Sequence, residues 1–153
     1  MLVATRCGTI SGVTDGPVSE RSLHQVLVAT DAIRAQWTLT VARQGRIWLL
    51  ALRGDETQDT WAASGPDLFE ALRNLRRLID PLGVRLALNG ARRDAWASGM
   101  QRDMGEGRYV YLLEPGQTGR PEQVDTLGTA PIELIGSVAE QEAHYAHWLS
   151  MRG

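Results

Sequence analysis

Two runs of alternating residues, separated by a tight-turn signal, limit what this chain can fold into more than any other feature. From Trp37 to Ala42 the large apolar residues occupy every second position, which is the period at which strand side chains share a face. Gln44-Gly45 follows, and Ile47–Leu52 then forms a second, more apolar run. We expect the two runs to pair as a β-hairpin, with Thr60–Ala63 as the third strand of an antiparallel meander.

The clearest helix signal directly follows this meander. Large apolar residues recur at spacings of three and four between Leu68 and Ile79, which predicts an apolar stripe that packs across the sheet. Pro66 suits a first helical turn, and Asp67 and Glu70 have the spacing of an N-terminal capping box. The opposite face carries Arg73, Arg76 and Arg77. We expect this basic face to be solvated.

The residues before the hairpin allow two interpretations. Apolar residues at spacings of three and four favour a short helix from Ser22 to Ala35, although Val26–Ala29 can also pair as a strand. Residues 1–20 are rich in glycine, serine and threonine and show no sustained period. We expect them to form a flexible arm or, at Leu2–Thr5, a short strand.

Alternation predicts three further strands after the central helix, at Val84–Leu88, Arg108–Glu114 and Gln123–Leu127. Ser137 and Glu140 then form a second capping-box signal, which predicts a C-terminal helix. Its buried side is expected to carry Val138, Gln141, Tyr145, Trp148 and Leu149.

Strands in consecutive runs, rather than in strict alternation with helices, predict an α+β fold. We expect a mostly antiparallel sheet covered by helices on one face, as a single pair of layers. A length of 153 residues suits one such domain, which we place at residues 21–153.

Composition excludes several classes of protein. The single cysteine, Cys7, excludes an internal disulfide framework, and the longest apolar run is far too short to span a bilayer. The N-terminus has no basic region of a signal peptide. We therefore expect a cytoplasmic protein with no membrane association. All 16 basic residues are arginine, which is typical of GC-rich bacterial coding sequences.

The segment from Asn89 to Gly107, called here the connecting segment, is unusually rich in arginine, tryptophan, methionine and glycine. One interpretation is a recognition loop whose partner-binding side chains are Arg92, Arg93, Asp94, Trp96, Met100 and Arg102. The other is a structured crossover, in which the large apolar residues fill the edge of the core and Asp94 pairs with an arginine. Ser98 is expected to cap a short helical turn through Met104.

No catalytic, metal or cofactor site is predicted. His144 and His147 lie three residues apart without a third ligand, which is weak evidence for a metal. No serine lies in a nucleophile-elbow pattern, and Cys7 has no evident base. The glycine-rich end of the connecting segment lacks the lysine of a P-loop. A net charge of −2 and the absence of a binding signature argue against direct nucleic-acid binding.

Two blocks of the sequence, NGARRDAWASGMQRDMGEG and the ending SVAEQEAHYAHWL, resemble small immunity proteins of bacterial polymorphic toxin systems. The resemblance is one of apolar periods from Pro66 onward, and no binding residue is carried over from it. It implies a non-catalytic protein that occludes the active site of a toxin.

Acidic residues near the C-terminus, Glu133, Glu140 and Glu142, form a second candidate partner-binding surface. The alternative function is a small-molecule or anion-binding module that uses the Ser98 helix start with Arg92 or Arg102. The sequence carries no indication of the oligomeric state.

Overall fold

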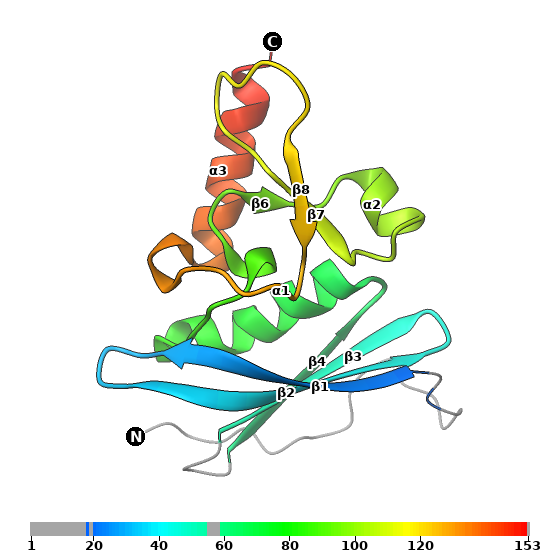
Figure 1. Ribbon diagram of the computed structural model, residues 1–153, viewed down its shortest axis with the longest axis vertical. Helices are drawn as coiled ribbons and strands as arrows, with labels where there is room; N and C mark the ends of the chain where they lie inside the picture. Colours follow the sequence, from blue (N-terminus) through cyan, green and yellow to red (C-terminus); the bar gives the residue numbers. More distant parts are fainter. Residues whose placement is uncertain (1–17, 19, 55–58, 153) are drawn as a thin grey trace.

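The computed structural model describes residues 18, 20–54 and 59–152, and within them it shows the predicted α+β fold (Figure 1). The strands form two antiparallel sheets, one of five strands and one of three. The predicted arm at residues 1–20 lies, except for residues 18 and 20, outside the described residues, and Cys7 with it.

The five-stranded sheet has the order β4-β3-β2-β1-β5. Its strands are β1 (Glu20–Ala29), β2 (Arg34–Gln44), β3 (Ile47–Arg53), β4 (Thr60–Gly65) and β5 (Arg85–Leu86). The predicted hairpin is confirmed as β2 and β3, which pair from Gln44 and Ile47 onward. The predicted strand at 84–88 is shorter than expected, because β5 pairs with β1 at two residues only.

The helix predicted from Ser22 to Ala35 is wrong, and the alternative of a strand is right. These residues form β1, the turn and the start of β2, and Val26 pairs with Trp37 in an unbroken antiparallel register. Val26 and Val28 are buried whereas Leu23 is 69% exposed. The β-branched valines alternate as a half-buried strand requires, and pairing with β2 outweighs the local spacing that favoured a helix.

Helix α1 (Leu68–Ile79) lies across the inner face of the large sheet (Figure 1). Its apolar stripe joins the buried side chains of β1 to β4 in the main core, including Leu72, Leu75 and Trp61. Asp67 caps the helix by accepting a 2.9 Å hydrogen bond from the backbone N–H of Glu70. The Glu70 carboxylate instead pairs with arginines, which are described below.

A second layer covers the other side of α1 (Figure 1). It contains the small sheet of β6 (Ala95–Trp96), β7 (Tyr109–Leu112) and β8 (Glu122–Asp125), the helices α2 (Gly99–Asp103) and α3 (Val138–Ser150), and the 3-10 helices η2 (Asn89–Ala91) and η3 (Ile132–Leu134). A further 3-10 turn, η1 (Asp80–Leu82), follows α1. Helix α1 therefore lies between two layers rather than on the outside.

This position overturns the prediction of a solvated arginine face on α1. Arg73 and Arg76 are only 6% and 2% exposed, and of the three arginines only Arg77 is on the surface. The hydrophobic pattern placed the apolar stripe correctly, but it held no information about a second layer. The two buried arginines become the centre of the polar contacts between the layers.

Helix α3 begins with the predicted capping box of Ser137 and Glu140. Val138 and Gln141 are buried as expected, and Tyr145 and Trp148 are partly buried. Leu149, however, is 48% exposed, so its predicted burial is wrong, because the last turns of α3 extend beyond the body of the fold (Figure 1). Among the described residues, no helix is both long and apolar enough to cross a bilayer.

Candidate functional site

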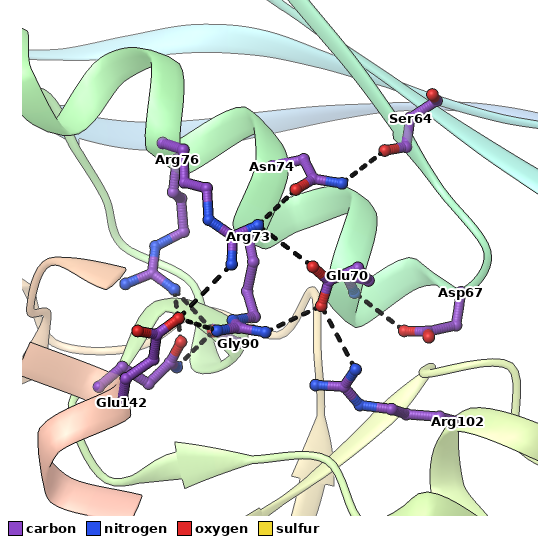
Figure 2. A network of polar contacts seen from close by, with 11 residues as sticks. Ser64, Asp67, Glu70, Arg73, Asn74, Arg76, Gly90, Arg102 and Glu142 are labelled. Carbon is purple, nitrogen blue, oxygen red and sulfur yellow. Dashed lines mark hydrogen bonds and ion pairs between the residues drawn. The ribbon is translucent and has the colours of Figure 1, made fainter. Parts of the chain in front are cut away.

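Buried arginines of α1 hold the two layers together (Figure 2). Arg76 donates to Oε1 of Gln141 at 2.8 Å and to the carbonyl of Gly136 at 2.7 Å. Burial lowers the pKa of Arg76 to about 10, still far above neutral pH, so the guanidinium stays charged and makes charge-assisted bonds. Gln141 in turn donates to the carbonyls of Gly90 and Arg92.

Glu70 is the acidic partner at the centre of this network. It accepts hydrogen bonds from Arg73 at 2.9 Å, from Arg77 at 3.1 Å and from Arg102 at 3.3 Å. Burial pushes the pKa of Glu70 upward, but the Arg77 hydrogen bond and the charges of Arg73 and Arg102 outweigh burial and lower it. Arg73 and Arg77 also pair with Glu142 of α3. This predicted partner-binding residue is therefore engaged within the fold.

The arginines of the connecting segment also have internal partners. Arg92 makes a forked contact with Asp94, with both N–O distances at 2.8 Å, and this hydrogen bonding raises the pKa of Arg92. Arg93 donates to the carbonyls of Glu133 and Ile135. The pairing of Asp94 with an arginine agrees with the crossover interpretation. The Arg93 contacts fix the segment to the residues before α3.

Trp96 is stacked within an aromatic column rather than presented alone. Its ring lies parallel to that of Tyr145 at 4.3 Å and edge-on to Phe69 at 5.5 Å. The guanidinium groups of Arg73 and Arg102 lie 4.7 and 5.6 Å from its centre. Such contacts have the geometry of cation–π interactions, so Trp96 and Arg102 contribute to the packing of the second layer.

Helix α2 gives the connecting segment its outward-facing side. Ser98 and Gln101 form a reciprocal capping box that fixes this single turn, as the expected Ser98 cap required. Met100 and Met104 are 71% and 81% exposed, so the expectation that they fill the edge of the core is wrong. A spacing of four residues places them on one side of the turn. We call this pair the methionine face.

The anion-binding alternative has little geometric support. Its candidate cations, Arg92 and Arg102, are paired with Asp94 and Glu70. The side chains of Ser98 and Gln101 bond the backbone at the start of α2. These side chains are therefore engaged within the fold rather than directed to an anion.

The candidate residues of α3 are used to begin and anchor the helix. Glu140 completes the capping box with Ser137, and hydrogen bonds from the backbone and side chain of Ser137 lower its pKa. His144 bonds the carbonyl of Leu113 through Nε2 at 2.6 Å. In the described part of the chain, no cluster of three or more histidine, cysteine or acidic residues has the arrangement of a metal site.

A cleft of about 640 Å³ lies between the end of the large sheet and the small sheet. Its apolar lining is Val41, Trp48, Leu68 and Leu127, and its polar lining is Glu20, Arg21, Ser22, His24, Arg108, Tyr109 and Asp125, with Gly128. Ser22 Oγ and His24 Nε2 are 2.9 Å apart. This cleft was not predicted from the sequence, because a helix was expected at Ser22. The signal was available in the alternation of His24, Val26 and Val28.

Four alternating charges close one end of the cleft above Trp48. Arg43 lies 2.6 Å from Glu106, Arg108 lies 2.8 Å from Glu20, and weaker contacts of 3.6 and 3.9 Å complete the ring. The guanidinium groups of Arg108 and Arg43 lie 4.8 and 5.8 Å from the centre of the Trp48 ring. These charges satisfy one another, so they form a wall of the cleft rather than free binding groups.

No protein-family model matches this chain, and no curated protein matches it either. The arrangement of its own side chains is therefore the basis for a proposal of function.

Proposed function

We propose that the chain is a non-catalytic protein that binds another protein, and that the methionine face is part of the binding surface. The supporting observation is the exposure of Met100 and Met104 on a turn whose backbone is fixed by its own capping box. Methionine side chains adapt to a partner surface. A fixed turn loses little conformational entropy on binding.

Within this proposal, the chain acts as an immunity-type inhibitor in the cytoplasm of a bacterium. The methionine face docks beside the active site of a cognate toxin and excludes its substrate. The exposed carboxylate of Glu133 and the net charge of −2 favour a basic partner, such as a toxin that acts on nucleic acid.

The test is to co-express the full chain with the product of each toxin-like gene found beside its own gene in the genome. The proposal expects a complex that co-elutes in a fixed stoichiometry and a toxin whose activity is blocked in the complex. The double variant Met100→Glu and Met104→Glu is expected to weaken the complex at least tenfold. Leu78→Glu, which changes another exposed apolar residue on α1, is the matched control.

Two results would contradict the proposal. One is a complex whose affinity is the same with and without the methionine face. The other is turnover of any substrate by the isolated chain at an enzyme-like rate, because an occluding inhibitor has no reaction of its own.

A further inference from the structure

Among the described residues, strand β1 has a neighbour along its whole length on one side but not on the other. On the first side it pairs with β2 from Glu20 to Ala29. On the second side β5 pairs only with Val28 and Ala29, and the last contact is a 2.9 Å hydrogen bond from the N–H of Ala87 to the carbonyl of Leu27. The residues from Glu20 to Val26 therefore form an edge of the large sheet.

The carbonyl of Leu27 points to the β5 side of β1, and this direction shows which other main-chain groups of β1 point to the edge. In an antiparallel strand the N–H and C=O of one residue point to the same side, and alternate residues share that side. Arg21, Leu23 and Gln25 therefore direct their N–H and C=O groups to the edge. Within the described chain, none of these groups takes part in a hydrogen bond. A row of donors and acceptors repeats there about every 7 Å.

Among the described residues, the edge lacks most of the features that usually prevent strand pairing, although it carries the charged Glu20 and Arg21. Proteins protect such edges with proline, lysine, a β-bulge or a covering loop. The segment from Glu20 to Val26 contains no proline and no lysine, and its register with β2 runs without interruption. The edge is thus regular enough to pair with another extended backbone.

The cleft described above lies directly beside this edge. Ser22 and His24 of β1 line it, and they alternate with the residues whose main chain faces the edge. Val41, Leu68 and Leu127 supply apolar surface inside it. A strand added along the edge would place every second side chain on this face of the sheet, where the cleft has room for an apolar one.

We infer that the free edge of β1 binds an extended segment of a partner protein by strand addition. The occupant is a stretch of about five residues, since three alternate residues of β1 supply the hydrogen-bonding groups. It carries an apolar side chain that enters the cleft and an acidic side chain that reaches Arg21. Only a peptide backbone offers donors and acceptors at the required repeat.

Two side chains on β1 give this edge its selectivity. Leu23 is 69% exposed on the outer face, so it provides an apolar contact for a side chain of the added strand on that face. Arg21 has no ion-pair partner within the described residues, whereas the nearby Arg108 is already paired with Glu20. An acidic residue in the added strand is therefore favoured over a basic one.

The proposed surface is separate from the methionine face and goes beyond the proposed function. Variants of Met100 and Met104 leave the edge of β1 intact, and variants of Leu23 leave α2 intact. Loss of one interaction can therefore be distinguished from loss of the other.

The experiment uses the full chain and a phage-displayed library of nine-residue peptides. Selected peptides are synthesised with a fluorescent label, and their affinity is measured by polarisation. The proposal expects binding that protects the amides of Arg21, Leu23 and Gln25 from hydrogen exchange. Methylation of alternate backbone nitrogens in the peptide is expected to lower its affinity at least tenfold, because it removes the hydrogen bonds and retains the side chains.

Matched variants separate main-chain from side-chain binding. Leu23→Pro removes an N–H that points to the edge and retains the pairing with β2, so peptide affinity is expected to fall at least tenfold. Leu23→Ala retains that N–H and is expected to cost less than fivefold. Arg21→Glu is expected to weaken acidic peptides, whereas Arg46→Glu in the β2–β3 turn is not. Circular dichroism verifies that each variant is folded. If Leu23→Pro does not fold, the peptide-methylation experiment still tests whether binding depends on main-chain hydrogen bonds.

Three outcomes would overturn the inference. The first is that selection yields no peptide that binds the chain. The second is that selected peptides bind without protecting the three amides. The third is that these amides are already protected in the free chain, which would show that another part of the chain, or in a concentration-dependent dimer a second copy, covers the edge.

Discussion

The guanidinium of Arg76 donates a 2.8 Å hydrogen bond to Oε1 of Gln141, and so joins α1 to α3 across 65 residues of sequence. Both side chains are almost completely buried. Each also bonds backbone carbonyls of the segments between the two helices. The contact between the layers is therefore polar at its centre, and its stability depends on every one of these groups having a partner.

Replacement of Arg76 by methionine is expected to lower the free energy of unfolding by about 3 kcal/mol, because buried oxygens are left without a donor. The matched control is Arg77→Met on the same helix. The Arg77 side chain is 43% exposed, and loss of its surface ion pairs is expected to cost less than about 1 kcal/mol. Urea unfolding of the two variants measures the difference. Equal losses would show that the buried guanidinium contributes nothing beyond a surface one.

The aromatic column gives a second pair of variants. Trp96 contacts Phe69, Tyr145 and two arginines, whereas Trp148, further along α3, stacks on Tyr145 at 6.1 Å and lies beneath Arg152. Trp96→Ala is expected to cost about 3 kcal/mol of unfolding free energy, and Trp148→Ala about 1 kcal/mol. Thermal and urea unfolding check both values. A larger loss at Trp148 would place the main packing of α3 at its C-terminal end.

These contacts show which parts of the structure could be predicted from the sequence. The β2–β3 hairpin, α1 and the caps at Ser98 and Ser137 depend on residues close together in the chain, so local patterns predicted them. Strand β1 was not predicted as the first choice, because its identity depends on pairing with β2. The burial of Arg76 depends on groups contributed by distant segments, and no local pattern records them.

The connecting segment was predicted in part. Its short capped turn followed from Ser98, and pairing of Asp94 with an arginine was foreseen as one alternative. The segment presents fewer side chains to a partner than the recognition-loop interpretation expects, because Arg93 bonds the carbonyl of Glu133 and Trp96 stacks on Tyr145 of α3. The position of an arginine in the sequence does not show whether its side chain binds a partner protein or another part of its own chain.

Two carboxyl groups at the start of α1 are expected to affect acid stability in opposite directions. The folded-state pKa of Glu70 is lowered from 4.5, so its contribution is present above that pKa and is lost as the pH falls through the folded-state value. Burial raises the pKa of Asp67 from 3.8, so its contribution is present at low pH and is lost as the pH rises through its folded-state value.

The pH dependence of the unfolding free energy separates the two groups. Between about pH 6 and about pH 3, the range in which carboxyl groups titrate, Glu70→Gln is expected to reduce the loss of stability on acidification. Asp67→Asn retains a capping side chain and is expected to make that loss steeper. Urea titrations at several pH values measure both slopes. Slopes that change in the same direction for both variants would contradict the opposite pKa shifts of Glu70 and Asp67.

Alanine substitutions at two glycines with similar φ angles separate the energetic cost of backbone strain from that of a steric clash. Gly107 has φ of 71° and Gly45 has φ of 61°, a region that alanine enters at a cost of about 1 kcal/mol. A Cβ on Gly45 meets no atom within 4 Å, whereas a Cβ on Gly107 would lie 2.6 Å from both the Asp67 carboxylate and the Phe69 backbone nitrogen.

Gly45→Ala is therefore expected to lower the free energy of unfolding by about 1 kcal/mol, from backbone strain alone. Gly107→Ala is expected to cost about 3 kcal/mol or more, because it also displaces the first turn of α1 from the loop that follows α2. That turn is held there by a 2.8 Å hydrogen bond from the N–H of Leu68 to the carbonyl of Glu106. Equal costs for the two variants would mean that the loop moves away freely, and that the second layer is not fixed to the start of α1.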